Sequence, residues 1–110
     1  MIIVKNTVKI TKGEAHKLTD RFQQTGLIDS FPGFIDLDVL INRKEGDTDE
    51  VIISTRWETF EDFSRWLGSD EFRQKHKHGK KQPDFIQSSV ITTYDVAVSR
   101  KSIVQKENVS

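Results

Sequence analysis

The first ten residues alternate between apolar and polar side chains, which is the two-residue period of a half-buried strand. Ile2, Val4, Val8 and Ile10 share one face of this predicted strand, and Asn6 occupies the middle of that face. A buried amide without partners costs about 1–3 kcal/mol. Asn6 is therefore either satisfied by backbone or water, or it faces a cavity where a ligand meets it. The pattern leaves both possibilities open.

A helical pattern follows the first strand. Thr11 and Glu14 have the spacing of a capping box, in which each side chain satisfies a free backbone donor of a new helix. Ala15, Leu18 and Phe22 then recur at the spacing of one buried helix face. This pattern predicts an amphipathic helix that ends near residue 26, with Phe22 in the core or shared with a pocket.

Two further strands are predicted in the middle of the chain. A turn signal at residues 31–33 precedes an apolar-rich segment at 34–42, and a polar loop at 43–50 separates it from an alternating segment at 51–57. The short connection predicts that these strands pair as an antiparallel hairpin. Trp57 falls on the apolar side of the alternation and is expected in the core.

A second helix is predicted after Thr59, which has the position of an N-cap. Phe60, Phe63 and Leu67 give its buried stripe. We expect the helix to stop near residue 68. Trp66 lies beside the stripe, so its ring either packs at the edge of the core or forms the wall of a pocket.

A short helix beginning at Ser69 would place Phe72 and His76 on one face, because they are four residues apart. Histidine ligates iron, copper or zinc and also transfers protons near neutral pH. His76 is thus either a pocket-facing ligand or a solvated residue at a helix end. The final alternating segment, at residues 86–98, predicts a last strand.

The predicted order is strand, helix, strand, strand, helix, strand, with the second helix broken at residues 68–69. This order is typical of an α+β, ferredoxin-like antiparallel sheet with both helices on one face. We expect a single domain at residues 1–98 and a polar tail at 99–110. Apolar residues such as Ile3 and Ile35 would be exposed on the uncovered face, which favours a homodimer, back to back or closed into an α+β barrel.

Charge and composition exclude several classes of function. Lysine plus arginine and aspartate plus glutamate number 17 each, so no global basic field favours nucleic acid or anionic membranes. The absence of cysteine excludes disulfides, thiolate metal sites and cysteine nucleophiles. No segment has the length of a membrane span or the form of a signal peptide, and we expect a cytoplasmic protein. A local basic cluster is either solvated or meets ligand carboxylates or phosphates; it comprises Arg73, Lys75, Lys77, Lys80 and Lys81.

The combination of Asn6, Trp66 and His76 at this spacing resembles the IsdG-type haem-degrading monooxygenases, within the superfamily of antibiotic biosynthesis monooxygenase-like dimeric α+β barrels. The resemblance extends over residues 1–98. It is carried also by short matching segments, among them residues 10–13, 20–22, 32–34, 49–51, 55–57 and 93–96. The segment containing His76 reads Ser-Asp-Glu-Phe-Arg-Gln-Lys-His-Lys-His.

The resemblance implies that haem b is both cofactor and substrate. His76 would then be the axial ligand of the haem iron, and Asn6 would donate its amide hydrogen on the opposite side, where dioxygen binds. Trp66 would press on the macrocycle and distort it, and Phe22 would line the pocket. The reaction would use dioxygen and electrons from a reductase or ascorbate to open the porphyrin and release iron.

Two other readings remain. The first is a cofactor-free monooxygenase of an aromatic or quinone-like substrate, in which His76 acts as an acid or base. The second is a haem carrier or sensor without turnover. His78 would point away from His76 on a continued helix, and His16 lies on the exposed side of the first helix. Neither histidine completes a recognisable zinc site.

Overall fold

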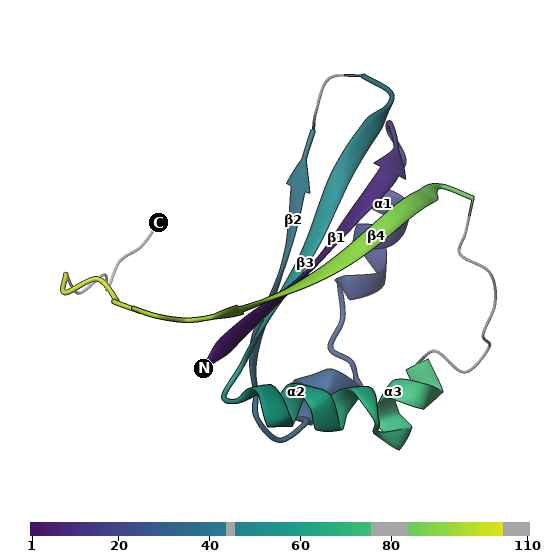
Figure 1. Cartoon of the computed structure of the whole chain (residues 1–110). Coiled ribbons are helices and arrows are strands. Elements are labelled where there is room, and N and C mark those ends of the chain that lie inside the picture. The colour runs from purple at the N-terminus through teal and green to yellow at the C-terminus, as the bar shows by residue number, and fades with distance from the viewer. Residues whose placement is uncertain (44–45, 76–83, 105–110) are drawn as a thin grey trace.

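One antiparallel sheet organises the chain, and the computed structural model describes residues 1–43, 46–75 and 84–104 of it. Within these residues the four strands pair in the order β2-β3-β1-β4, and the helices lie on one side of the sheet (Figure 1). This arrangement confirms the ferredoxin-like α+β prediction. The elements are β1 (Ile2–Thr11), α1 (His16–Thr19), η1 (Asp20–Phe22), η2 (Leu27–Ser30), β2 (Phe34–Asn42), β3 (Thr48–Trp57), α2 (Phe60–Leu67), α3 (Asp70–Lys75) and β4 (Ile86–Asp95).

The strand register divides the sheet into two faces. Val4, opposite Thr55 on β3, is buried beneath the helices, and the row that passes through Ile3 and Arg56 lies on the outer face, away from them. Ile35 sits at an irregularity in the pairing of β2 with β3 and is exposed, as the sequence predicted. The outer face therefore carries side chains that no helix of the described chain covers.

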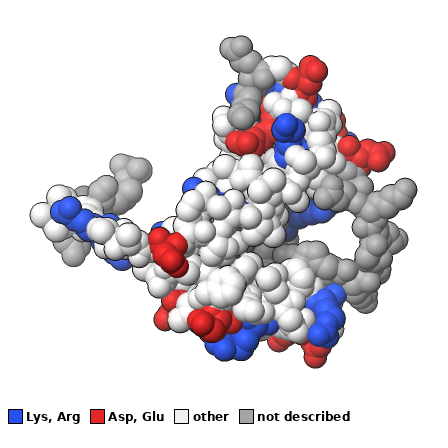
Figure 2. Space-filling model, viewed as in Figure 1, with Lys and Arg blue, Asp and Glu red and all other residues white. Residues whose placement is uncertain are grey.

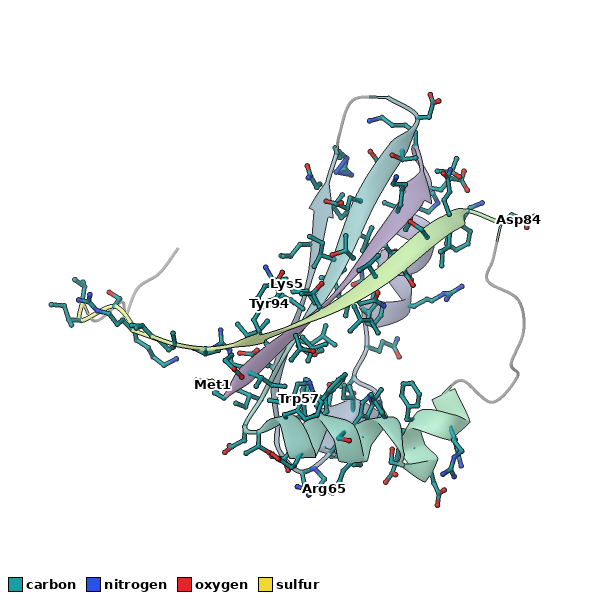
Figure 3. All side chains as sticks on the ribbon, in the orientation of Figure 1. Met1, Lys5, Trp57, Arg65, Asp84 and Tyr94 are labelled. Carbon is teal, nitrogen blue, oxygen red and sulfur yellow. The ribbon has the colours of Figure 1, made fainter. Side chains whose placement is uncertain are left out.

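The helix-facing side of the sheet holds two apolar clusters rather than one core. The first cluster lies under α2 and consists of Ile2, Val4, Ile28, Trp57, Phe63 and Trp66. The second lies under α1 and consists of Val8, Ile10, Ala15, Leu18 and Val51. Trp57 is fully buried between the sheet and α2 (Figure 3), as its place in the alternation predicted.

The first helix is shorter than predicted, and the proposed capping box is wrong. Residue 15 is the N-cap of α1, no side chain caps this helix, and the chain continues as the 3₁₀ turn η1. The N–H of Gly13 instead donates to the Asp49 carboxylate of β3, at 3.1 Å. Gly26 does not end the first helix either, because it is the N-cap of η2 and its N–H donates to Asp29.

The face that α2 buries also differs from the prediction. Thr59 caps this helix as expected, since its Oγ1 accepts the N–H of Asp62 at 3.1 Å, and Gly68 is its C-cap. Phe63 and Trp66 are the buried positions, whereas Phe60 and Leu67 are exposed. The helix is rotated because the larger indole of Trp66 takes the place in the core that the stripe prediction gave to Leu67.

The strand ends were also misplaced in part. β3 begins at Thr48, within the segment that the sequence indicated as loop, and β4 ends at Asp95 rather than at residue 98. The pairing of β1 with β4 shifts between Lys9 and Ile10, so Ile86 pairs with Ile10 on the helix side. Strict alternation through the last strand is thereby broken.

A buried carboxylate joins the start of β3 to the turn after β1. Asp49 accepts the Gly13 N–H with Oδ2, and its Oδ1 lies 3.1 Å from Lys12 Nζ. The Gly13 hydrogen bond, and after it the ammonium of Lys12, hold the pKa of Asp49 below its ordinary value of 3.8. Because the folded pKa is depressed, the resulting stabilisation is present above the unfolded pKa and is lost as pH falls through the folded pKa.

We predict that Asp49→Asn lowers the free energy of unfolding at neutral pH, because it removes the charge that Gly13 and Lys12 stabilise. The difference from the parent protein should begin to shrink as pH falls below 3.8, where the unfolded carboxyl becomes protonated, and should vanish once pH has fallen through the lower pKa of the folded protein. Urea denaturation at a series of pH values measures this, with Asn in place of the exposed Asp20 as the control. A difference that is unchanged in acid would contradict the assigned role.

Candidate functional site

An unpaired amide lies between the two apolar clusters. Asn6 is in the middle of β1, between Val4 of the first cluster and Val8 of the second. Its Oδ1 is buried and has no hydrogen-bond partner in the described chain. Among the described residues, backbone groups do not satisfy this oxygen, so water and a ligand remain as its possible partners. A group from outside the described residues has to compensate this amide.

The sheet around Asn6 is not sealed by helices. Asn6 pairs in register with Ile53 on β3 and Ile91 on β4, so the three side chains form one row on the helix side. Ile91 is nevertheless 59% exposed. Figure 2 shows the surface hollowed between the part that carries α1 and the part that carries α2 and α3. We call this hollow the central opening.

Trp66 belongs to the apolar cluster under α2. The indole is 4% exposed and is bracketed by Phe31, at 5.2 Å between ring centroids, and Phe72, at 5.6 Å. Both contacts are edge-to-face, with interplanar angles of 71° and 76°. This geometry is favourable for aromatic pairs and fixes the plane of the indole. Trp66 is thus a rigid core residue rather than an edge contact.

The sequence did not identify Phe31 and Phe72 as the residues that hold Trp66. Phe31 had been interpreted only as part of a turn, and Phe72 only as a neighbour of His76 on the last helix. Both residues are aromatic and lie on segments that pack beside α2, and this feature of the sequence could have identified them. Ser69 completes the arrangement, since its hydroxyl donates to the Trp66 carbonyl at 2.6 Å and accepts the Phe72 N–H at 3.1 Å.

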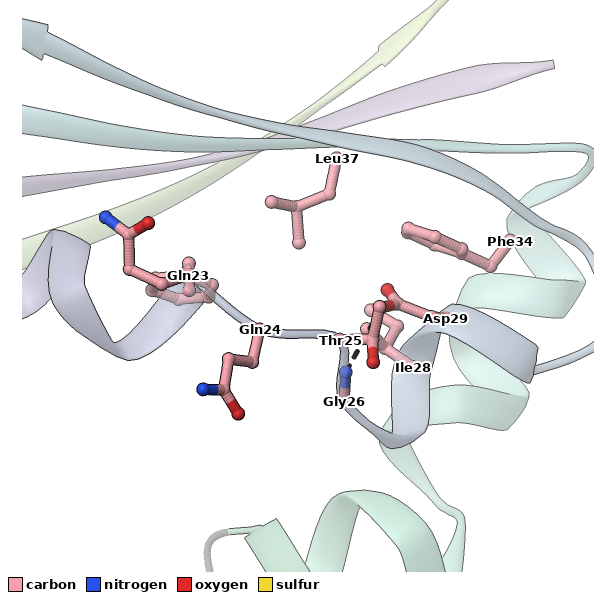
Figure 4. Close-up of a pocket in the computed structure, with 9 residues that line it drawn as sticks. Gln23, Gln24, Thr25, Gly26, Ile28, Asp29, Phe34 and Leu37 are labelled. Carbon is pink, nitrogen blue, oxygen red and sulfur yellow. Dashed lines mark hydrogen bonds between the residues drawn. The ribbon is translucent and has the colours of Figure 1, made fainter.

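Phe22 lies beside the cluster under α1. Its ring is half-buried and packs against that cluster. Phe22 also lines a cavity of about 250 Å³ that lies between β2 and the connection from η1 to η2 (Figure 4). Neither Asn6 nor Trp66 lines this cavity. It is smaller than the roughly 300–1,000 Å³ of usual small-molecule sites, so we regard it as a neighbour of the central opening rather than as the site.

His76 lies outside the described residues, as do His78, Lys77, Lys80 and Lys81. The described chain on this side ends with α3, one residue before His76. Phe72 packs on Trp66, which turns one face of α3 toward the first cluster. The assignment of His76 as a ligand stays a prediction. In the described residues, no group of three histidine, aspartate or glutamate side chains could hold a metal ion.

Of the predicted basic cluster, Arg73 is already engaged within its own helix. Its guanidinium donates to Asp70 at 2.9 Å and to the Gly68 carbonyl at 3.2 Å. A different basic pair, Lys17 and Arg21, lies over the ring of Phe85. Lys17 Nζ is 5.7 Å and the Arg21 guanidinium 5.9 Å from its centroid. Lys17 also pairs with Glu14 at 2.5 Å and so lowers the pKa of that carboxyl.

Among the helices that the structure describes, none has the length and apolar character of a membrane span.

The candidate site is assembled from four elements. β1 supplies the amide of Asn6, η1 supplies Phe22, and α2 supplies Trp66 with its bracket from α3. Such a site can hold a flat apolar ligand and offer it one hydrogen bond, but it lacks a described pair of acid and base groups.

Comparison with known proteins shows the family of this chain. The model of the family described as "Antibiotic biosynthesis monooxygenase" matches residues 1–78. Proteins named "Heme-degrading monooxygenase" from Bacillus thuringiensis (strain Al Hakam) and Bacillus cereus (strain AH187) are each 50% identical over 100 residues, which cover 91% of this chain and 94% of the relative.

Solved structures share the fold. A Bacillus cereus protein described as an antibiotic biosynthesis monooxygenase superposes with a TM-score of 0.79 at 32% identity, covering 94% of this chain and 98% of that one. The heme-degrader MhuD from Mycobacterium tuberculosis, with two hemes bound in its active site, gives a TM-score of 0.71 at 19% identity over 92% and 100% of the two chains. From the matched residues and the identity to its relatives, we conclude that this chain belongs to the antibiotic biosynthesis monooxygenase family.

Proposed function

We propose that this protein is a haem-degrading monooxygenase, with haem as its substrate in the central opening. The observation that carries the proposal is the buried, unpaired Oδ1 of Asn6 between two apolar clusters. An apolar slot with a single amide suits a large flat ring whose centre takes part in a hydrogen bond. The 50% identity to proteins named for haem degradation supports the same substrate.

The chain's own groups have limited but defined tasks in this proposal. The amide of Asn6 carries both a donor and an acceptor and would offer its N–H to the bound ring. Trp66, held by Phe31 and Phe72, is a rigid surface for the macrocycle to press against. Phe22 lines the opposite wall and excludes water. His76 supplies the imidazole that ligates iron.

Haem itself, once bound, supplies the redox chemistry, with dioxygen as the oxidant and a reductase or ascorbate as the external donor of electrons. The protein then binds and orients the ring and keeps the reacting edge dry. Because haem supplies the redox chemistry and the protein supplies binding, the reaction does not require a pair of acid and base side chains. This also distinguishes the proposal from a cofactor-free monooxygenase, which would have to activate its own substrate by proton transfer.

The experiment that tests the function is the addition of hemin to the purified protein. A Soret band that shifts and saturates at one equivalent is expected, followed by its decay in air when ascorbate is supplied, with iron released to a chelator. A protein that does not bind hemin would favour the cofactor-free reading. A shifted band that persists with ascorbate and with a reductase would favour a carrier or sensor.

We predict that Asn6→Ala still binds hemin but degrades it roughly 100-fold more slowly, the usual effect of removing one preorganised hydrogen-bond donor. Affinity should persist because most of it comes from apolar contact. The rate of Soret decay and the hemin titration measure the two effects separately. Lys9→Ala, on the same strand but exposed, is the matched control. Parent-like turnover in the asparagine variant would remove Asn6 from the mechanism.

We predict that His76→Ala loses the axial ligand, so hemin binds weakly and with an altered Soret position. Added imidazole should restore the parent spectrum, because it replaces the missing ligand without a covalent link. His16→Ala and His78→Ala serve as controls and should leave the spectrum unchanged. If the spectrum of the His76 variant matches that of the parent, the ligand is another residue.

The outer face of the sheet supports the proposal that the protein works as a homodimer. Leu40, Ile52, Thr7 and Val90 are neighbours in register and form a row across all the strands of the sheet. Leu40 and Val90 are largely exposed on the single chain. A second copy that covers this row would remove their apolar surface from water.

We predict that Val90→Lys converts the dimer to monomers. The residue is exposed on the single chain, so the substitution should cost the monomer fold little, whereas an interface would have to bury the new ammonium. Sedimentation equilibrium measures the change, and circular dichroism checks that the fold persists. An unchanged dimer with this variant would place the interface elsewhere.

A further inference from the structure

A single hydroxyl ties the end of α2 to the beginning of α3. The side chain of Ser69, in the break between the two helices, donates to the Trp66 carbonyl at 2.6 Å and accepts the Phe72 N–H at 3.1 Å. A serine hydroxyl has one donor and two acceptor sites, so both bonds form at the same time. The two residues that it joins are also in ring contact, with centroids 5.6 Å apart.

The hydroxyl that caps α2 makes a different set of bonds. Thr59 accepts the Asp62 N–H at 3.1 Å and donates to the carboxylate of the same residue at 3.0 Å. Both of its bonds therefore stay within one helix. Ser69 accepts a helical N–H in the same way, as an N-cap does, but it directs its own proton to the preceding helix. Its hydroxyl thus does more than cap α3.

A second link crosses the same break but is more exposed to solvent. The Arg73 guanidinium donates to the Gly68 carbonyl at 3.2 Å and to the Asp70 carboxylate at 2.9 Å. The side chain of Arg73 is 68% exposed, so water competes for both contacts. The bonds of Ser69 are partly buried, where competition from water is weaker. We therefore regard the Ser69 hydroxyl as the main link across the break.

The position of Phe72 depends on this link. It is the only apolar residue of α3, which spans 6 residues and is too short to be stable in water by itself. Phe72 is partly buried and packs against the apolar cluster under α2. Its ring lies where the first turn of α3 places it, and the Ser69 hydroxyl fixes that turn through the Phe72 N–H.

Phe72 in turn fixes one side of the Trp66 indole. Phe31 contacts the indole at 5.2 Å and 71°, and Phe72 contacts it at 5.6 Å and 76°. Edge-to-face contacts of this kind have a preferred angle, so two of them define the plane of the indole better than one. Without Phe72, Phe31 is the remaining ring contact of Trp66 in the described chain.

We propose that Ser69 is a positioning residue for Trp66. Its hydroxyl holds Phe72 against the indole and thereby sets the angle at which the indole meets the bound macrocycle. Ser69 acts through Trp66 and Phe72 rather than on the ring of the substrate. The inference rests on the proposed function, because it concerns the surface against which haem is pressed, and it makes the distortion of the porphyrin depend on one hydroxyl.

Fluorine NMR of protein labelled with fluorotryptophan tests the first step without haem. The chain contains 2 tryptophans, so two signals are expected, and Trp66→Phe shows which one belongs to Trp66. Ser69→Ala should shift and broaden the Trp66 signal and leave the Trp57 signal in place. Ser69→Thr keeps a capping hydroxyl and should restore the parent signal.

Thr59→Ala is the matched control, because it also removes a hydroxyl that accepts a helical N–H at 3.1 Å. It should lower stability to urea as Ser69→Ala does, yet leave the Trp66 signal unchanged, since Thr59 bonds only within its own helix. A double variant, Ser69→Ala with Phe72→Leu, should change the Trp66 signal no more than Phe72→Leu alone, because residues that act as one unit are not additive.

The second step is measured on the protein loaded with hemin. The out-of-plane porphyrin bands in the resonance Raman spectrum should weaken in Ser69→Ala and return in Ser69→Thr. The rate of Soret decay with ascorbate should fall roughly 10-fold in Ser69→Ala, because a misplacement of about 1 Å costs about 100-fold and Phe31 still holds the indole. Thr59→Ala should match the parent in both measurements.

Several results would overturn the inference. If Ser69→Ala matches the parent in the Trp66 signal and the porphyrin bands, the positioning role is refuted and haem degradation still stands. Equal changes in Thr59→Ala refute it as well, because loss of stability alone then explains them. Additive effects in the double variant show that Ser69 does not act through Phe72. If the parent protein does not bind hemin, the proposed function fails and the positioning role fails with it.

Discussion

The proposed site depends on the side-chain amide of Asn6, whose buried oxygen has no hydrogen-bond partner among the described residues. Asn6 sits in a strand whose neighbouring inward positions are Val4 and Val8, and its buried Oδ1 has no partner in the described chain. An unsatisfied group of this kind costs about 1–3 kcal/mol, so a protein of this size retains it at a real cost in stability. A water or a ligand group that donates to Oδ1 would offset this cost, while the N–H of the same amide stays available as a donor. The two apolar clusters stay separate at this point, and the sheet there remains open to a flat molecule.

The aromatic residues explain how a small domain keeps such an opening without collapse. Trp57, Phe31, Trp66 and Phe72 are linked by successive ring contacts from the sheet to α3. Because these contacts are edge-to-face and the rings are large, the wall is rigid although it is thin. On the other side, α1 is short and the chain passes through η1 to the connection that lines the small cavity (Figure 4). The site is thus rigid on the Trp66 side and less regular on the Phe22 side.

Alternation of side chains was sufficient to predict the strands, their hairpin and the uncovered outer face, because strand periodicity is local. It also placed Asn6 on the inner face, where the structure has it. The pattern predicted that α2 buries Leu67, whereas the structure buries Trp66. Trp66 is buried because its ring packs against Phe31 and Phe72, which come from other segments. The capping box failed because Asp49, 36 residues away, takes the Gly13 N–H. Such errors arise because the deciding partners are distant in the sequence, and local patterns do not contain them. The predicted role of His76 came from the family resemblance and not from the pattern.

The most direct test of the central claim is the nitrogen and proton NMR signal of the Asn6 side-chain amide during titration with gallium protoporphyrin. This diamagnetic, redox-inert ring binds without turnover and shifts nearby protons through its ring current. The account predicts a large shift for the Asn6 amide protons, saturating at one equivalent. The exposed amide of Asn42, which bonds Glu50 at 3.3 Å, should not move. A bound porphyrin that leaves the Asn6 signal as unchanged as that of Asn42 would contradict the account.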